Sequence, residues 1–199
     1  MTLRKFPLRV IVLAIMLPIW VVAGCGEVKA EAGNAYRKYV ESLMARPPEG
    51  VVFREDLETY LDQLASSYRR SKRRPALAAD PALREAARAQ AIDMMLAGRS
   101  SHRSRTGHDF KARFAAFLSA DNTAWVSGEN AASDRRKGAV DKARAKRLFQ
   151  LWIDSTGHRK NLLRDRYVHV STGAVQRGDE IWSVQIFWSE PIRTDLVIQ

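Results

Sequence analysis

The chain has 199 residues, of which 46% are hydrophobic and 28% are charged, a length that suits one sizeable domain and is marginal for two. Eleven Gly and seven Pro exclude a collagen-like or low-complexity chain, and a single Cys excludes an intramolecular disulfide. Lys and Arg outnumber Asp and Glu by 33 to 22, which gives a net charge of +11 and indicates an acidic partner such as nucleic acid, anionic lipid or an anionic polymer.

The N-terminal segment 1–24 has the features of a bacterial secretory signal. Residues 1–9 are basic with no acidic side chain, and the uncharged run 10–24 is shorter than the about 20 apolar residues that a spanning helix needs. The sequence Val-Ala-Gly-Cys at 22–25 resembles a lipobox, so we expect cleavage before Cys25 and acylation of its thiol, for instance with palmitate. An uncleaved anchor helix with a buried Cys is the alternative.

Cleavage before Cys25 determines the expected compartment. The mature chain 25–199 would carry 30 Lys and Arg against 22 Asp and Glu, a net charge of +8. We therefore expect a cell-envelope protein held on a membrane by its acyl chains, because one chain alone anchors weakly. Gly26 stands where an Asp would resemble an inner-membrane retention signal, which favours the outer membrane, facing the periplasm. Nucleic acid is then excluded as a partner.

Two helices are predicted in the first half of the mature chain. Residues 26–53 predict a tether with one short, loosely docked helix, which the Pro-Pro-Glu-Gly at 47–50 ends. From residue 55 an apolar stripe predicts a stronger helix that runs into the basic segment 69–74. We interpret that segment as a solvated helix end and linker, and contact with lipid phosphates is the alternative.

The next helices are predicted from their caps. Asp80 before Pro81 predicts a helix start, and Gly98 predicts its end. Thr106, with Asp109 three residues later, predicts the cap of a phenylalanine-rich helix. A fourth helix is predicted over about 139–155 and is expected to end at Gly157.

After that helix the hydrophobic period changes from that of a helix to two. Apolar residues alternate over 168–173 and again over 181–188, and Gly178-Asp179 between them suits a type II′ hairpin turn. Residues 125–127 are a candidate for a further strand. Helices followed by strands predict an α+β fold or a helix–sheet–helix sandwich.

Four histidines and one acidic residue are the candidates for chemistry. His102 lies in a loop, His158 follows a predicted helix end, and Glu129 stands in a Gly-Glu-Asn tripeptide after an apparent strand. His108 is expected at a helix end and His169 at the surface or a strand edge. The chain has no HExxH, paired CxxC, GxSxG, P-loop or Rossmann fingerprint, which excludes the common local signatures of zinc proteases, zinc fingers, serine hydrolases and nucleotide binders.

One ordered set of motifs resembles a known family. Ser-His at 101–102 is followed by Gly-Glu-Asn at 128–130, then by a stretch from Trp152 through Gly-His-Arg-Lys-Asn-Leu-Leu at 157–163, then by the aromatic hairpin. In this order they resemble the CAP superfamily, also called the SCP-like extracellular domain, over about residues 55–189. The resemblance implies a three-layer α–β–α sandwich with a central antiparallel sheet, of class α+β.

The resemblance also implies a cleft that gathers two histidines and two acidic residues. Position by position, His102 and His158 match the histidines and Glu129 matches one acid. Ser155 stands where the eukaryotic pattern has the second acid, which removes one ligand. Asn130 follows Glu129 in the tripeptide, and we include Asn130 and Ser155 among the expected cleft residues.

Three readings of this trio stay open. Two neutral imidazoles and a carboxylate are suitable ligands for Zn²⁺ or another divalent metal. Without metal, Glu129 would raise the pKa of both histidines and favour imidazolium, which makes a cationic pocket for an anionic headgroup or a sugar carboxylate. Alternatively, His102, Glu129 and His158 only hydrogen-bond a loop to a helix.

The sequence therefore predicts a signal peptide at 1–24, a tether and short helix at 25–54, a CAP-like domain at 55–190 and a tail at 191–199. The expected function is binding of a lipid, glycan, metal or envelope component in the cleft, and no catalytic residue is established. One alternative is a metal-dependent hydrolase of peptide or cell-wall bonds with Glu129 as the candidate base. Another is a structural envelope protein whose basic faces contact anionic lipid.

Overall fold

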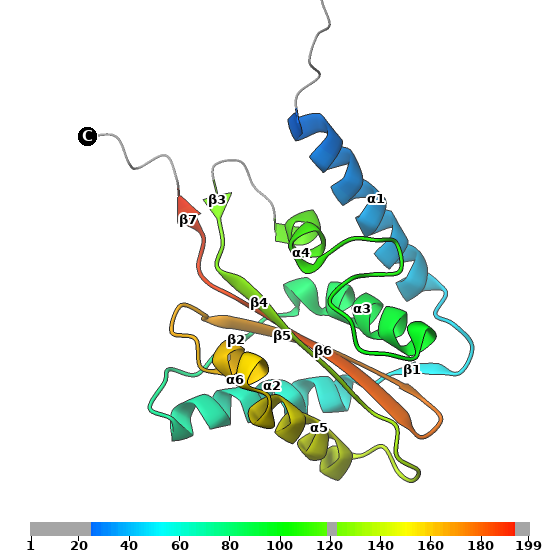
Figure 1. The fold of residues 1–199 in the computed structure, drawn as a ribbon, viewed down its shortest axis with the longest axis vertical. Helices are drawn as coiled ribbons and strands as arrows, with labels where there is room; N and C mark the ends of the chain where they lie inside the picture. Colours follow the sequence, from blue (N-terminus) through cyan, green and yellow to red (C-terminus); the bar gives the residue numbers. More distant parts are fainter. Residues whose placement is uncertain (1–24, 119–122, 194–199) are drawn as a thin grey trace, which may run out of the picture.

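The computed structural model describes residues 25–118 and 123–193, and they form three layers around one sheet (Figure 1). One outer layer contains α1 (Cys25–Ala45), α3 (Arg84–Ala97), which follows the 3₁₀ turn Pro81–Leu83, and α4 (Phe110–Leu118). The other contains α2 (Glu55–Ser71), α5 (Lys142–Asp154) and α6 (Thr156–Leu162). The sheet contains β1 (Val51–Phe53), β2 (Ala78–Ala79), β4 (Ser127–Asp134), β5 (His169–Arg177) and β6 (Glu180–Trp188). This arrangement confirms the predicted α+β, α–β–α sandwich.

The sheet has the order β1-β5-β6-β4, and all of these neighbours are antiparallel. β2 adds a short parallel pairing to β5, beside the far end of the edge that β1 covers. The β5–β6 hairpin turns at Gly178, whose φ of 57° belongs to the left-handed region that a type II′ turn requires at this position. Outside this sheet, β3 (Thr123–Ala124) pairs with β7 (Ile192–Arg193), so part of the predicted tail is paired.

Both faces of the sheet are buried, so most residues of β5 and β6 are buried, including polar ones such as Thr172 and Gln185. Alternate residues point to opposite faces, so Phe187 joins the core under α2, α5 and α6. Its neighbours Ile186 and Trp188 join the core under α3 and α4. At Gly173 of β5 a Cβ atom would collide with the backbone of α3, so the missing side chain lets helix and strand pack closely.

The segment before residue 55 is more than a tether. The helix α1 runs to Ala45, and its Tyr36 and Val40 are fully buried in a small core beside α3 and α4. The strand Val51–Phe53 pairs with Val175–Arg177 of β5 and extends the main sheet. The prediction of a loosely docked helix is wrong, and the packed unit begins before residue 55. Residues 1–24, with the predicted signal, lie outside the described residues.

The basic segment at the end of α2 also departs from the prediction. Arg69 is fully buried, and its guanidinium donates hydrogen bonds to the carbonyl oxygens of Pro75, Leu162, Arg164 and Tyr167, at 2.7–3.2 Å. The residues that follow it, 70–74, are exposed as predicted. The buried arginine therefore fixes the end of α2 against the segment that follows α6.

One predicted helix start and one predicted helix end differ from those in the structure. Asp109, and not Thr106, caps α4, because its Oδ1 accepts a hydrogen bond from the Ala112 amide at 2.9 Å. Gly157 does not end α5; the chain turns at Ser155 and Gly157 lies inside α6. In the described ranges 25–118 and 123–193, no helix combines the length and apolarity needed to span a bilayer.

Candidate functional site

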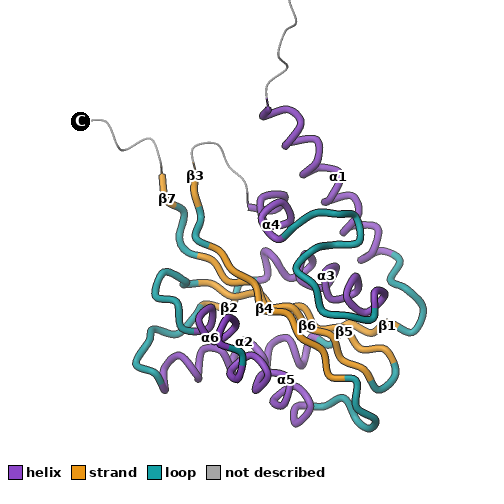
Figure 2. Tube along the Cα trace, in the orientation of Figure 1, coloured by secondary structure: helices purple, strands orange, loops and turns teal. Residues whose placement is uncertain are grey.

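The structure brings together the three side chains that the motifs singled out. His102 lies in the loop between α3 and α4 (Figure 2), Glu129 on β4, and His158 in the first turn of α6. The imidazole Nδ1 of His102 lies 2.8 Å from Oε1 of Glu129, and the ring centres of the two histidines are 6.2 Å apart. Because β4 is an edge strand, side chains from the two outer layers can meet around it.

Glu129 is a buried carboxylate with a buried partner. Its side chain is 1% exposed, as is that of Arg113 on α4, and Nη2 of Arg113 lies 2.9 Å from each carboxylate oxygen. The same nitrogen donates to the carbonyl oxygen of His102 at 3.2 Å. A buried carboxylate without such a cation would be strongly unfavourable, so the Arg113 guanidinium compensates the burial of Glu129 beneath His102.

Arg113 is the functional residue that the sequence analysis missed. It lies in a helix recognised by its phenylalanines, where an arginine reads as solvent-facing. The sequence signal that could have found Arg113 is the N-cap at Asp109. A helix that starts there places residue 113 in its first turn, next to the buried Phe114. Nothing local in the sequence links it to Glu129, 16 residues away.

The helix α1 packs beside this cluster. Tyr36 is fully buried, and its ring centre lies 5.1 Å from that of His108. Tyr39 donates a hydrogen bond to Asp93 on α3, and the other oxygen of Asp93 accepts from the Arg105 amide at 2.9 Å. These contacts join α1 and α3 to the loop that carries His102.

Asn130 and Ser155, both expected in the cleft, contact the backbone of His158. Nδ2 of the fully buried Asn130 donates to the carbonyl oxygen of His158 at 3.2 Å. Asn161 reaches back to Oδ1 of Asn130 at 3.0 Å and to the Glu129 carbonyl oxygen at 3.1 Å. Ser155 is the N-cap of α6, with its Oγ facing the His158 amide. Together they attach the first turns of α6 to β4 and so fix His158.

The two imidazoles differ in their electrostatic surroundings. The hydrogen bond that His102 donates to Glu129, together with the charge of the carboxylate, raises the pKa of His102 above its ordinary value. Burial and the neighbouring His102 lower the pKa of His158. The expectation that Glu129 raises the pKa of both histidines is therefore met in direction for His102 and not for His158. The site pairs an imidazole whose pKa is raised with one whose pKa is lowered.

The residues as placed do not fit a metal ion. Both oxygens of Glu129 are engaged by the Arg113 guanidinium, a cation that would repel a metal. Nδ1 of His102 is occupied by the same carboxylate. In the part of the chain that the structure describes, no group of three or more His, Cys, Asp or Glu side chains is arranged to hold a metal.

The remaining histidines lie elsewhere. His108 contacts Thr106 Oγ1 at 2.8 Å just before α4. His169, at the start of β5, contacts Glu190 Oε1 at 3.0 Å and stacks on Trp188 with ring centres 5.2 Å apart. His108 thus lies beside a helix end, as predicted, and His169 lies partly exposed at the start of a strand.

Comparison with known sequences matches most of the domain. The model of the cysteine-rich secretory protein family, CAP, matches residues 62–187. The uncharacterized protein YkwD of Bacillus subtilis is 28% identical over 123 residues, which are 62% of this chain and 44% of YkwD. The chain thus spans less than half the length of this curated relative.

Two solved structures share the fold. An extracellular protein of Bacillus anthracis that contains an SCP domain matches with a TM-score of 0.54 and 24% identity, over 68% of this chain and 41% of that protein. An outer surface protein of Borrelia burgdorferi matches with a TM-score of 0.57 and 15% identity, over 70% of this chain and 96% of that protein. At these identities the likeness establishes the fold alone.

Proposed function

Because this chain belongs to the cysteine-rich secretory protein (CAP) family, we propose that it is an extracellular envelope protein that binds a small ligand at His102, Glu129 and His158. One observation carries the proposal. The His102 side chain is 55% exposed, yet its Nδ1 is held by a carboxylate that is 1% exposed. A surface imidazole fixed by a buried ion pair is preorganised to meet a ligand.

The geometry favours an anionic or hydrogen-bond-accepting group on the ligand. Since Nδ1 of His102 faces Glu129, Nε2 is the ring nitrogen left for a ligand, and the raised pKa favours the cationic form, which donates from Nε2. The neutral imidazole of His158, half-buried beside it, supplies one donor and one acceptor. A lipid headgroup or an acidic sugar has suitable chemistry, and the arginine-paired Glu129 makes metal the weakest of the predicted ligands.

The location is proposed on two grounds. One structural relative is described as extracellular and another as an outer surface protein. The residues before Cys25 have the pattern of a lipoprotein signal, so we propose acylation of Cys25 and attachment to the outer membrane, facing the periplasm. Mass spectrometry of the purified protein tests this directly: a mature N-terminus at Cys25 bearing acyl chains is expected, and an intact residue 1 would contradict it.

A hydrolase is the second candidate, with chemistry that differs from the metal-dependent one expected. The opposite pKa shifts of His102 and His158 are those of an acid–base pair. His158 would act as base and His102 as acid, while Glu129, bound by Arg113, would orient His102. Release of fragments from peptidoglycan or model peptides that is lost in both His102→Ala and His158→Ala would support this candidate over simple binding.

The ligand proposal is tested by what the protein retains. Protein purified without detergent is extracted with organic solvent, and the extract is compared by mass spectrometry between wild type and His102→Ala, with His169→Ala as the matched control. We expect a bound lipid or glycan that disappears in His102→Ala and persists in His169→Ala.

Titration with phosphatidylglycerol micelles and with Zn²⁺, on the same three proteins, gives a second readout. Binding of phosphatidylglycerol that falls about tenfold in His102→Ala and not in His169→Ala supports the proposal. Equal binding by all three proteins, with nothing extracted from any of them, would contradict it. Zn²⁺ binding that depends on His102 would show that the arginine-paired Glu129 yields to a metal.

A further inference from the structure

A groove between α2 and the segment 77–79 has the features of a second site. It has a volume of about 450 Å³, and one wall is a stripe of α2 formed by Thr59, Asp62, Gln63, Ser66, Ser67 and Arg70. These positions repeat at three and four residues, so they lie on one helix face. The segment 77–79 forms the other wall, where Ser66 Oγ contacts both the carbonyl oxygen and the amide of Leu77.

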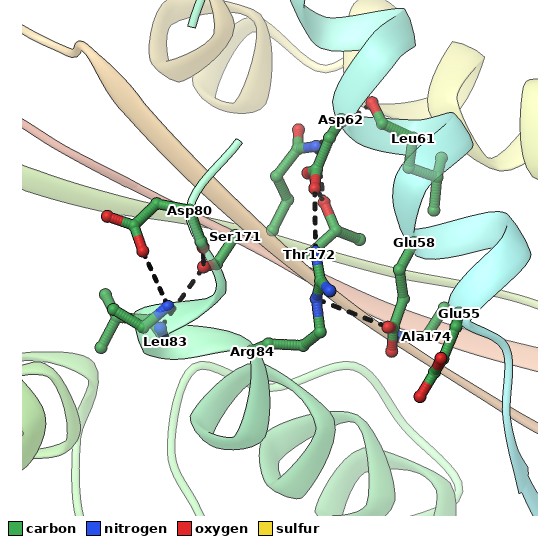
Figure 3. A network of polar contacts seen from close by, with 12 residues as sticks. Glu55, Glu58, Leu61, Asp62, Asp80, Leu83, Arg84, Ser171, Thr172 and Ala174 are labelled. Atoms are coloured by element: carbon green, nitrogen blue, oxygen red, sulfur yellow. Dashed lines mark hydrogen bonds and ion pairs between the residues drawn. The ribbon is translucent and has the colours of Figure 1, made fainter. Parts of the chain in front are cut away.

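The carboxylate of Asp62 lies behind the groove wall. The Asp62 side chain is 3% exposed, and its Oδ1 accepts a hydrogen bond from the Thr172 hydroxyl of β5 (Figure 3). Its Oδ2 faces Nη2 of Arg84 at 3.7 Å. The polar groups that a ligand in the groove can reach are therefore those of the exposed Thr59, Gln63 and Ser67.

At the Arg70 end the groove opens onto a dense basic surface. Buried Arg69 holds the end of α2 against the chain that follows α6, and Arg74 forms an ion pair with Asp165 there. Two basic segments that are distant in the sequence thus meet. We define the basic end by its exposed cations, Arg70, Lys72, Arg73, Arg74, Lys160, Arg164 and Arg166.

We propose that the groove and the basic end together bind an acidic polysaccharide. The groove offers hydroxyl and amide groups, which recognise the hydroxyls of a sugar. The basic end is mostly arginine, whose planar guanidinium pairs with carboxylate or phosphate groups in bidentate fashion. Arg70 belongs to both parts, so one chain can place its sugar hydroxyls in the groove and its charges on the basic end.

This chemistry distinguishes a glycan from other polyanions. A polyphosphate satisfies the arginines but has no sugar hydroxyls to pair with the hydroxyl and amide groups of the groove. A neutral glucan can donate hydroxyls to the groove but gives the basic end no counter-charge. The inference does not depend on the proposed ligand site, because the two sites share no residue.

Calorimetry with an oligogalacturonate at pH 8 is the direct test. Arg73→Asn with Arg166→Ser removes two exposed cations from the basic end, and Arg46→Ser with Arg177→Ser is the matched control, since both of its arginines are exposed elsewhere. Asn suits position 73, where φ is 57°. We expect about tenfold weaker binding in the first double variant and little change in the control.

Gln63→Ala with Ser67→Ala tests the groove, because it removes an exposed amide and an exposed hydroxyl from the α2 wall. We expect about threefold weaker binding of oligogalacturonate and unchanged binding of polyphosphate. Equal losses in Arg73→Asn with Arg166→Ser and in its control, or equal effects of Gln63→Ala with Ser67→Ala on both ligands, would overturn the inference. So would equally tight binding of maltooligosaccharide, or tight binding of phosphatidylglycerol vesicles that Arg73→Asn with Arg166→Ser weakens equally.

His102→Ala separates this site from the proposed one. Oligogalacturonate binding that survives His102→Ala supports a second site even if no ligand is found at the first. Loss of oligogalacturonate binding in His102→Ala would place the glycan at the first site and overturn the inference. Circular dichroism melts of each variant establish that binding is compared between folded proteins.

Discussion

The two edges of the central sheet both bury a carboxylate against arginine, yet they use it differently. At the β4 edge, Glu129 belongs to the strand, pairs with Arg113 and holds the exposed imidazole of His102. The other edge is the stretch of β5 between β1 and β2, called here the β5 edge. There Glu58 comes from α2, pairs with Arg88 at 2.7 Å and accepts a hydrogen bond from the Ala174 amide at 3.0 Å.

The difference lies in what the ion pair supports. At the β5 edge the carboxylate satisfies a strand amide that lies between β1 and β2 and has no strand partner on that side, so its role is to complete the sheet. At the β4 edge the carboxylate fixes a side chain that solvent and ligands can reach. A buried ion pair alone is therefore no sign of a functional site, and the exposed group attached to it is the useful signal.

Removal of Arg113 gives the largest expected effect. Arg113→Met leaves Glu129 buried without its cation, and we expect the free energy of unfolding to fall by about 3–5 kcal/mol. Urea denaturation measures it, and Arg166→Met, an exposed arginine, is the control with a change within about 0.5 kcal/mol. Equal effects in both variants would show that the Glu129 pair does not hold the β4 edge.

Glu58→Gln makes the same test at the β5 edge. Glu58 is fully buried, and the amide replaces a carboxylate that receives hydrogen bonds from two nitrogens of Arg88. We expect a loss of about 2–3 kcal/mol with no change in the pKa of His102. A shift in the His102 titration would contradict the separation of the two edges.

Asp62→Asn sharpens the comparison through pH. Burial raises the pKa of Asp62 from 3.8 to about 7, so the folded state holds a proton that the unfolded state releases. The stability linked to that proton is present below pH 4 and is lost as the pH rises through 7. Wild type should therefore lose about 1–3 kcal/mol more than Asp62→Asn between pH 5 and pH 8, measured by urea denaturation. Parallel pH profiles would exclude a buried, titrating Asp62.

Local patterns were sufficient for most of the elements. The stripe after residue 55, the Asp80 start, the Gly98 end and the hairpin at Gly178 each depend on neighbouring residues, and the structure contains all four. The predicted end of α5 at Gly157 is wrong, because glycine is typical of a helix end but Ser155 is the N-cap of the next helix, α6. Local signals give elements reliably and their ends less so.

The site could be predicted only in part. Motif order was enough to select His102, Glu129 and His158, which do converge. Arg113 and Arg69 were missed because their partners are remote in the sequence: Glu129 for the first, and carbonyl oxygens more than 90 residues away for the second. Burial of a charged side chain is decided by tertiary packing, which no window of sequence contains.

The histidine titrations, followed by NMR in wild type and Glu129→Gln, test the central claim most directly. Wild-type His102 should titrate above the ordinary histidine pKa of 6.5 and His158 below it, because Glu129 holds the first and burial disfavours charge on the second. In Glu129→Gln the pKa of His102 should fall toward that of His158. Two histidines that titrate together in wild type, or a gap that Glu129→Gln leaves unchanged, would contradict the account.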